Sequence, residues 1–194
     1  LLESMSKKLK KSRIDVGAQN CHEQENYGAF TGSINPTMLK SVGANYIIIG
    51  HSENRKMGET DKLINLKIKS TLKSKLKVIF CIGETLKQKR KRMTKKILDS
   101  QIKLGLKKIK NKKDILIAYE PVWSIGTGII PKTDNLEKQV FIIKKMIMKV
   151  WKINKPKIIY GGSVNSKNIT ELKKISLITG FLIGGASQNA NNFI

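Results

Sequence analysis

Six short apolar runs recur along this chain, each followed by a turn and then an amphipathic stretch. The runs begin near Asp15, Tyr46, Val78, Ile115, Ile158 and Phe181. Most carry almost no polar residue, and strands that are apolar on both faces are typical of a parallel sheet covered by helices. The pattern therefore predicts an α/β chain of repeating strand–helix units, either a doubly wound sheet or a (β/α) barrel.

Capping residues predict where two of the helices begin and end. Asn35-Pro36 starts a helix that ends at Gly43, because proline suits the first helical turn and glycine the residue after the last turn. Asp134 and Glu137 form a capping-box-like pair ahead of apolar residues at three- and four-residue steps. We expect a helix from this second start as well.

Polar and glycine residues gather directly after the predicted strands. These segments are Gln19-Asn20, Gly50-His51-Ser52-Glu53, Gly83-Glu84, Glu120, Gly161-Gly162-Ser163 and Gly184-Gly185. Parallel strands would bring all of them to one rim, and a barrel builds its active site from many strand ends, whereas an open sheet uses one switch point. The distribution favours a barrel, which we expect to form a single domain over residues 1–194.

The formal net charge of +24 comes from 38 Lys and Arg against 14 Asp and Glu. Such a charge could attract nucleic acid, an anionic membrane or a phosphorylated substrate. The basic residues are spread over nearly every predicted helix, and aromatic residues make up only 6% of the chain, so we favour solvated helix faces over a surface that stacks bases. Lys87–Lys96, the densest basic run, opens a helical pattern that continues to Leu106, and we interpret it as the outer face of one helix.

Neither a membrane span nor a structural metal site is expected. No apolar run approaches the length needed to cross a bilayer, and no signal-peptide pattern is visible. Cys21 and Cys81 lie far apart without a metal-type spacing, which favours a reducing, cytoplasmic setting. We expect no nucleic-acid or membrane partner.

Glu120 is the candidate catalytic base. It follows the apolar run 115–119 and precedes Pro121, so its side chain should project at the end of a strand. The following residues, through Gly126 and Gly128, combine a rigid start with two glycines that allow large backbone excursions, as a lid requires. An ordinary connection with a solvated glutamate remains the alternative.

Two further features complete a candidate site. His51 precedes a short helical stretch, whose N-terminus favours a neutral imidazole that can donate a hydrogen bond to a carbonyl oxygen; a structural histidine is the alternative. Ser163, Gly184 and Gly185 lie in glycine pairs after the last two strands, where backbone N–H groups can approach a phosphate, although tight packing also selects such pairs. Together with Glu120, these groups suit proton abstraction beside the carbonyl of a small phosphorylated substrate.

The sequence resembles the triosephosphate isomerase family over nearly all of residues 13–187. The resemblance rests on Gly17-Ala-Gln-Asn20, Gly28-Ala-Phe-Thr-Gly32, Ile49-Gly-His-Ser-Glu53, Cys81-Ile-Gly-Glu84, Ala118-Tyr-Glu-Pro-Val-Trp123 with Ile125-Gly-Thr-Gly128, Tyr160-Gly-Gly-Ser-Val164 and Gly184-Gly-Ala-Ser187. It implies a TIM (β/α)8-type barrel and the interconversion of dihydroxyacetone phosphate and D-glyceraldehyde 3-phosphate in glycolysis and gluconeogenesis. No cofactor and no metal are implied.

The resemblance also implies roles for individual residues. Glu120 would move the proton through an enediol intermediate, and His51 would polarise the carbonyl, the same two roles that these residue types have in that family. Residues Gly126, Ser163, Gly184 and Gly185 would hold the phosphate while 121–128 closes over it. Glu53 would occupy a buried acidic position behind the site.

A homodimer is implied by the same resemblance. The segment from Asn20 to Gly32 is similar to a long loop that reaches into a neighbouring subunit in that family. Thr31 would then lie near the active site of the partner.

The chain departs from the family pattern in two places. Six of the expected eight βα units are recognisable, and the first two are absent, together with an Asn-x-Lys motif whose lysine faces the substrate. A catalytically inactive phosphate-binding fragment is therefore the alternative function. Asn54 stands where the family usually has an arginine and only Arg55 remains, so we expect a stabilising ion pair of that family to be missing.

Overall fold

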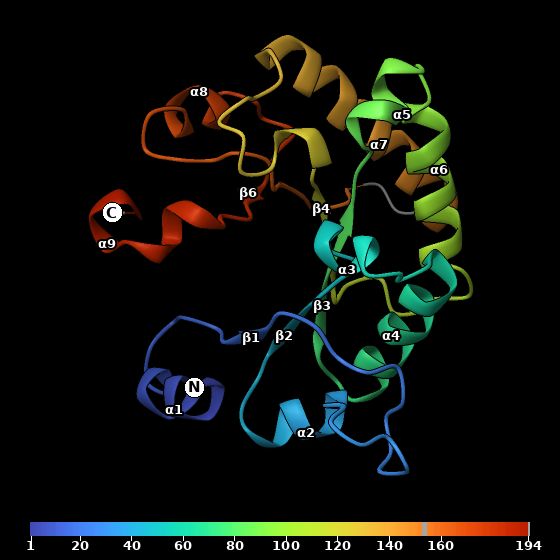
Figure 1. Cartoon of the computed structure of the whole chain (residues 1–194), viewed down its shortest axis with the longest axis vertical. Coiled ribbons are helices and arrows are strands. Elements are labelled where there is room, and N and C mark those ends of the chain that lie inside the picture. The colour runs from blue at the N-terminus through green and yellow to red at the C-terminus, as the bar shows by residue number, and fades with distance from the viewer. Residues whose placement is uncertain (153–154, 194) are drawn as a thin grey trace. The chain divides into compact units, whose positions relative to one another are not determined.

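The computed structural model describes residues 1–152 and 155–193 and contains a parallel sheet (Figure 1). Within these ranges its strands are β1 Gly17–Ala18, β2 Tyr46–Ile49, β3 Lys77–Ile82, β4 Ile115–Tyr119, β5 Ile158–Tyr160 and β6 Gly180–Phe181. The strand order follows the chain from β1 to β6, with parallel registers such as Gly17 opposite Tyr46 and Ile117 opposite Ile158. The predicted α/β class is confirmed, with a strand at each of the apolar runs.

Helices separate most of the strands. They are α1 Leu2–Leu9, α2 Pro36–Ser41, α3 Ser52–Lys56, α4 Asp61–Lys73, α5 Leu86–Arg90, α6 Thr94–Gly105, α7 Thr133–Trp151, α8 Ile169–Lys173 and α9 Ala190–Phe193, with 3₁₀ turns η1 Val122–Ser124 and η2 Gly185–Gln188. None of the helices in the described ranges combines the length and apolarity that a bilayer crossing needs. The expected start of α2 is confirmed, because the Asn35 side chain caps it by accepting a hydrogen bond from the Met38 N–H at 2.8 Å.

Two helix boundaries differ from the predictions. The pattern from Lys87 to Leu106 is divided between α5 and α6, because Arg92 adopts a left-handed conformation with φ of 57°. The capping box predicted at Asp134 is wrong, since α7 already begins at Thr133 and its N-cap, Lys132, makes no side-chain cap bond. Asp134 instead lies in the first turn, where a negative charge stabilises the positive end of the helix dipole.

The chain divides into two compact units. Unit 1 comprises Leu1–Phe80 and Leu104–Ile115, and unit 2 comprises Cys81–Lys103 and Leu116–Ile194. The single domain expected from the sequence stays a prediction.

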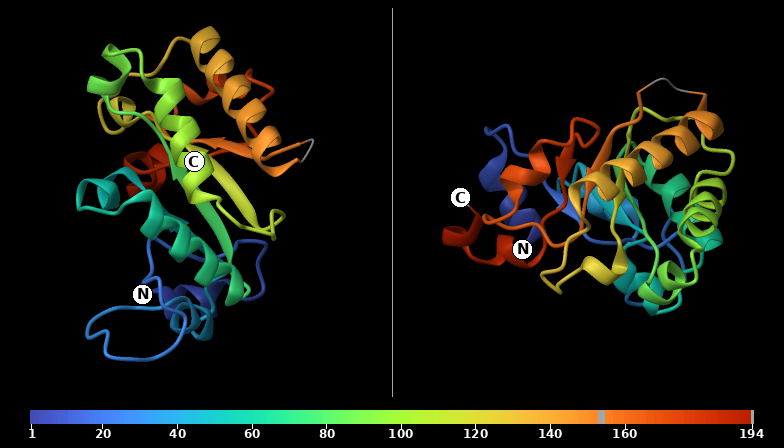
Figure 2. Two further views of the ribbon diagram at one scale, coloured as in Figure 1. Left: turned by 90° about the vertical axis from the view of Figure 1, so that its right-hand side faces the viewer. Right: turned by 90° about the horizontal axis from the view of Figure 1, so that it is seen from above.

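Unit 1 is built on β2 and the first part of β3. Helix α4 packs against β2, and its Ile64 and Ile68, one turn apart, are completely buried. Ile47 and Ile49 of β2 are equally buried. The long segment between β1 and α2 extends as a loop from the rest of this unit (Figure 2).

Unit 2 is built on β4 and β5, and helices α6 and α7 supply much of its core. Ile117 of β4 and Tyr160 of β5 are fully buried, as are Leu98 on α6 and Ile143 on α7. The apolar positions that predicted α7 from the sequence therefore form its buried face.

Replacement of Gly105 by alanine should destabilise unit 1. A Cβ atom at this position would lie 2.4 Å from Cζ of the buried Phe80, while the Asn65 side-chain amide holds the Gly105 carbonyl at 2.7 Å. The clash should cost about 1–3 kcal/mol, and alanine should regain about 1 kcal/mol or less in helix propensity at the helix end. We therefore expect a net decrease in the free energy of unfolding. Urea denaturation would measure the change, with Ser100→Ala on the exposed face of α6 as the control; a stability equal to that of the control would contradict the packing argument.

Candidate active site

Glu120 lies at the end of β4 with its side chain almost completely removed from solvent. The residue is 3% exposed, and its backbone N–H donates to the Ile82 carbonyl of β3 at 2.8 Å. The position at the strand end is as predicted. The alternative of an ordinary solvated loop glutamate is wrong, because a carboxylate buried at this position cannot be hydrated from bulk water.

Glycines of the two neighbouring strand ends make room for Glu120. A Cβ atom at Gly83 would lie 1.8 Å from the Glu120 carbonyl oxygen, and a Cβ at Gly161 would lie 2.7 Å from Glu120 Cγ and 3.0 Å from Oε1. Only glycine permits so close an approach of the backbone. Sequence reasoning noted both glycines as rim residues but did not connect them with the carboxylate.

The predicted lid segment, 121–128, begins with the 3₁₀ turn η1 and ends in two glycines with positive φ. Gly126 has φ of 68° and Gly128 has φ of 74°, conformations that side-chain-bearing residues rarely adopt. Both are exposed, and a Cβ at either position would meet nothing within 4 Å. Backbone conformation, and not packing, is therefore what selects glycine here.

Ser124 and Ser163 join this segment to the loop after β5. The Ser163 hydroxyl donates to the Ser124 carbonyl at 2.6 Å and accepts from the Gly128 N–H at 3.1 Å. The buried Ser124 hydroxyl donates to the Ile129 carbonyl at 2.5 Å and lies 3.2 Å from the Tyr160 hydroxyl. Hydrogen bonds of this serine pair thus hold the middle and the end of the segment.

A second buried carboxylate, Glu84, fixes the start of the segment. The Trp123 indole N–H donates to Glu84 at 2.9 Å, and the Tyr119 hydroxyl donates at 3.3 Å. Burial raises the pKa of Tyr119 well above its usual value, with the Glu84 charge adding to the shift, so the phenol keeps its proton. The Lys89 ammonium covers the Trp123 ring at 3.2 Å from its centroid. The sequence marked Glu84 as a rim residue but gave no sign of these donors.

Gly184 and Gly185 present exposed backbone at the start of η2. A Cβ at either position would have nothing within 4 Å, so tight packing does not explain this glycine pair. Open backbone N–H groups at the start of a turn are suited to an anion. At the other glycine pair, Gly162 has a packing reason, because a Cβ there would lie 2.1 Å from the Tyr160 hydroxyl.

His51, in unit 1, is the N-cap of α3, which begins at Ser52 as predicted. Its Nδ1 accepts a hydrogen bond from the Glu53 N–H at 3.4 Å. A neutral imidazole that accepts at Nδ1 carries its proton on Nε2. In this tautomer the ring donor is Nε2–H.

The expected burial of Glu53 is wrong. Its side chain is 77% exposed, because the residue lies on the outer side of the first turn of α3, with Oε2 3.8 Å from His51 Nδ1. The loss of an ion pair at Asn54 stays a prediction, while the neighbouring Arg55 is ion-paired. Its guanidinium contacts Asp61 at 2.6 Å and donates from Nε to the Gly50 carbonyl at 2.7 Å.

Asn20 belongs to a buried polar cluster at the base of the predicted subunit loop. Its amide donates to Glu59 Oε1 at 3.0 Å and its carbonyl oxygen accepts from the Lys67 ammonium at 3.1 Å. Lys67 is itself buried and ion-paired with Glu59. Neither charged residue was predicted, since a lysine on α4 and a glutamate just before that helix are indistinguishable in sequence from a solvated pair. Thr31, at the far end of the loop, is exposed.

Comparison with known proteins decides the family. The triosephosphate isomerase family model matches residues 1–194. The chain belongs to the triosephosphate isomerase family. The triosephosphate isomerase of Thermodesulfovibrio yellowstonii is 42% identical over 195 residues, which cover 99% of this chain and 79% of that protein. That of Finegoldia magna is 42% identical over 200 residues, with the same two coverages.

The fold comparison agrees with the family assignment. The crystal structure of triosephosphate isomerase from Bartonella henselae matches with a TM-score of 0.92 and 33% identity, covering 100% of this chain and 80% of that one. The resemblance drawn from the strand-end motifs is confirmed. The choice of a TIM-type fold over a doubly wound sheet is confirmed with it.

Replacement of Ser163 by alanine should loosen the lid segment. The change removes both the acceptor of the Gly128 N–H and the donor to the Ser124 carbonyl. Each such bond contributes about 1 kcal/mol, so the amide of Gly128 should exchange its hydrogen about fivefold faster or more. Hydrogen exchange followed by NMR would measure the rate, with Ser176→Ala, an exposed serine outside this network, as control. Unchanged exchange at Gly128 would show that the serine pair does not hold the segment.

Proposed function

We propose that this chain interconverts dihydroxyacetone phosphate and D-glyceraldehyde 3-phosphate, a reaction of glycolysis and gluconeogenesis. The family assignment over the whole chain supports the reaction. The single observation that carries the mechanism is the buried carboxylate of Glu120 at the end of β4, fitted against backbone at Gly83 and Gly161. Such a group suits the removal of a carbon-bound proton next to a carbonyl.

Glu120 is the proposed base. Its carboxylate takes a proton from C1 of dihydroxyacetone phosphate, the C–H electron pair forms a C1–C2 double bond, and the carbonyl oxygen becomes an enediolate oxygen. Return of the proton from the carboxylic acid to C2 yields the aldehyde. Burial supports this role, because a carboxylate with few water contacts needs less desolvation before it meets the substrate.

His51 is the proposed electrophile. With Nδ1 engaged by the Glu53 N–H, its Nε2–H can donate to the carbonyl oxygen and then exchange protons between the two oxygens of the enediol. Glu53 supports the histidine through its backbone N–H, which holds the tautomer, and its exposed carboxylate has no assigned part.

Phosphate binding is assigned to Gly126, Ser163, Gly184 and Gly185. Exposed glycine backbone at three of these positions supports the assignment, since N–H groups can reach phosphate oxygens without obstruction. Segment 121–128 would close over the bound substrate and exclude water, which protects the enediolate from loss of phosphate.

The chain is further proposed to act as a homodimer in the cytoplasm. The loop from Asn20 to Gly32 and the residues beside it expose Tyr27, Phe30 and Ile34, which are 77%, 40% and 53% exposed and available to a second copy. Cys21 and Cys81 are both buried, and a chain with so few cysteines fits a reducing compartment. The expected incomplete barrel, with six of eight βα units, also stays a prediction.

Glu120→Gln should lower kcat by about 10² to 10⁴-fold, because the amide cannot accept the proton. Glu120→Asp should also lower kcat, since a side chain shorter by one methylene withdraws the carboxylate from the reacting carbon. A coupled assay with either triose phosphate would measure both. Glu137→Gln, an exposed glutamate on α7, is the matched control and should leave kcat unchanged.

Turnover that survives both Glu120 substitutions would overturn the assignment of the base. If the unsubstituted chain binds inorganic phosphate but turns over neither triose, the alternative of an inactive phosphate-binding fragment holds instead.

The double substitution Tyr27→Asp with Phe30→Asp should convert the dimer to a monomer. The free energy needed to desolvate two carboxylates in the subunit contact exceeds the free energy that the contact contributes to association. Sedimentation velocity would report the mass, and Leu66→Asp, an exposed leucine on α4, should leave it unchanged. A dimer that persists in the double variant would place the subunit contact elsewhere.

A further inference from the structure

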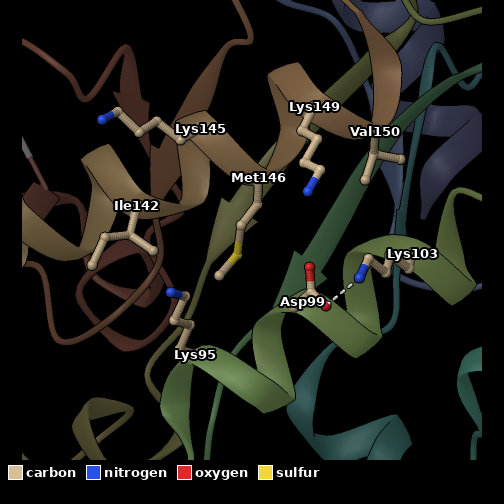
Figure 3. Close-up of a pocket in the computed structure, with 8 residues that line it drawn as sticks. All are labelled: Lys95, Asp99, Lys103, Ile142, Lys145, Met146, Lys149 and Val150. Carbon is tan, nitrogen blue, oxygen red and sulfur yellow. Dashed lines mark ion pairs between the residues drawn. The ribbon is translucent and has the colours of Figure 1, made fainter.

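Helices α6 and α7 of unit 2 border a groove of about 520 Å³ on their outer faces (Figure 3). Its lining residues are Lys95, Asp99 and Lys103 of α6 and Ile142, Lys145, Met146, Lys149 and Val150 of α7. None of these residues has a part in the proposed isomerase reaction. The volume lies within the range of about 300–1,000 Å³ that is usual for occupied sites.

The floor of the groove is an apolar stripe along α7. Ile142, Met146 and Val150 are four residues apart and so repeat at about 6 Å along one side of the helix. Met146 is 9% exposed, and its side chain extends between the two helices (Figure 3). A flexible thioether at this place can adapt to apolar groups of different shape.

The rims of the groove are basic and poorly balanced by acid. Four of the lining residues are lysines, and the one carboxylate, Asp99, is ion-paired with Lys103 at 2.6 Å. Lys95 of α6 and Lys149 of α7 point into the groove from its two rims, whereas the Lys145 ammonium extends away and lies 4.5 Å from the centroid of the Phe141 ring (Figure 3). An occupant must therefore supply negative charge beside an apolar surface.

We propose that this groove binds an acidic amphipathic helix of a partner protein. Leucine-type side chains at four-residue spacing would match the repeat of Ile142, Met146 and Val150, and glutamates on the two flanks of the helix would face Lys95 and Lys149 on the two rims. Burial of the apolar side chains supplies affinity, and the charge pattern selects an acidic partner over a basic one.

Charge alone would also suit nucleic acid or an anionic membrane, but the groove favours neither. A phosphate backbone leaves the apolar floor unused, and no exposed aromatic residue lines the groove to stack a base. A membrane surface is too flat to fill a concave site. A helix with an apolar ridge fills both the floor and the rims.

A synthetic peptide of about 16 residues tests the proposal on the intact chain. The fluorescein-labelled probe carries leucine at every fourth position, glutamates beside the leucines, and alanine elsewhere. We expect saturable binding by fluorescence anisotropy at about 150 mM salt. Replacement of the leucines by serine in the peptide should weaken binding at least tenfold, because only the apolar contact is lost.

Charge reversal in the protein supplies the matched comparison. Lys95→Glu with Lys149→Glu should weaken binding of the probe at least tenfold, whereas Lys8→Glu with Lys11→Glu, exposed residues of the N-terminal segment, changes the net charge equally and should alter it less than twofold. Ile142→Ser should weaken binding without a change in charge. Unaltered isomerase activity and melting temperature would show that each variant is folded.

The proposal is overturned if the probe does not bind, if the two double variants lose binding equally, or if the serine peptide binds as tightly as the leucine peptide. It is also overturned if duplex RNA or vesicles containing phosphatidylserine bind more tightly than the probe with the same dependence on Lys95 and Lys149.

Discussion

The close fit of Glu120 between two glycines is the constraint on which the site depends. Glu120 is buried, so the groups around it must leave room for it. A methyl group at Gly83 would collide with the Glu120 backbone carbonyl, and one at Gly161 would collide with the Glu120 side chain. The ends of β3, β4 and β5 therefore have to come together in one register for the base to exist at all. The sheet thus determines where the Glu120 carboxylate lies.

A second set of contacts holds the segment 121–128 against the strand ends. Glu84 takes the indole N–H of Trp123 at one side, while Ser124 and Ser163 join the later part of the segment to the end of β5. The same hydroxyl that the resemblance assigns to phosphate is here engaged with the lid. Under the proposed assignment of Ser163 to the phosphate, substrate binding and attachment of the segment 121–128 would draw on one oxygen atom.

The strands, the parallel sheet and the position of Glu120 could be predicted, because apolar runs and the polar residues after them reflect local periodicity. The division between α5 and α6 could not, since it follows from a left-handed Arg92 that no proline or glycine marks. The exposure of Glu53 and the burial of Lys67 were missed for a related reason: charged residues on short helices are sorted only by tertiary packing. The glycines beside Glu120 were visible in sequence, but their partner becomes evident only in three dimensions.

Strand order that follows the chain has a consequence for biosynthesis. Each strand pairs with the one made immediately before it, as β2 does with β1 and β5 with β4. Loops that close over short sequence distances cost little entropy and form early. As the chain leaves the ribosome, each new strand can pair with the exposed edge of the strand made before it. The order of translation can then be the order in which the strands join the sheet.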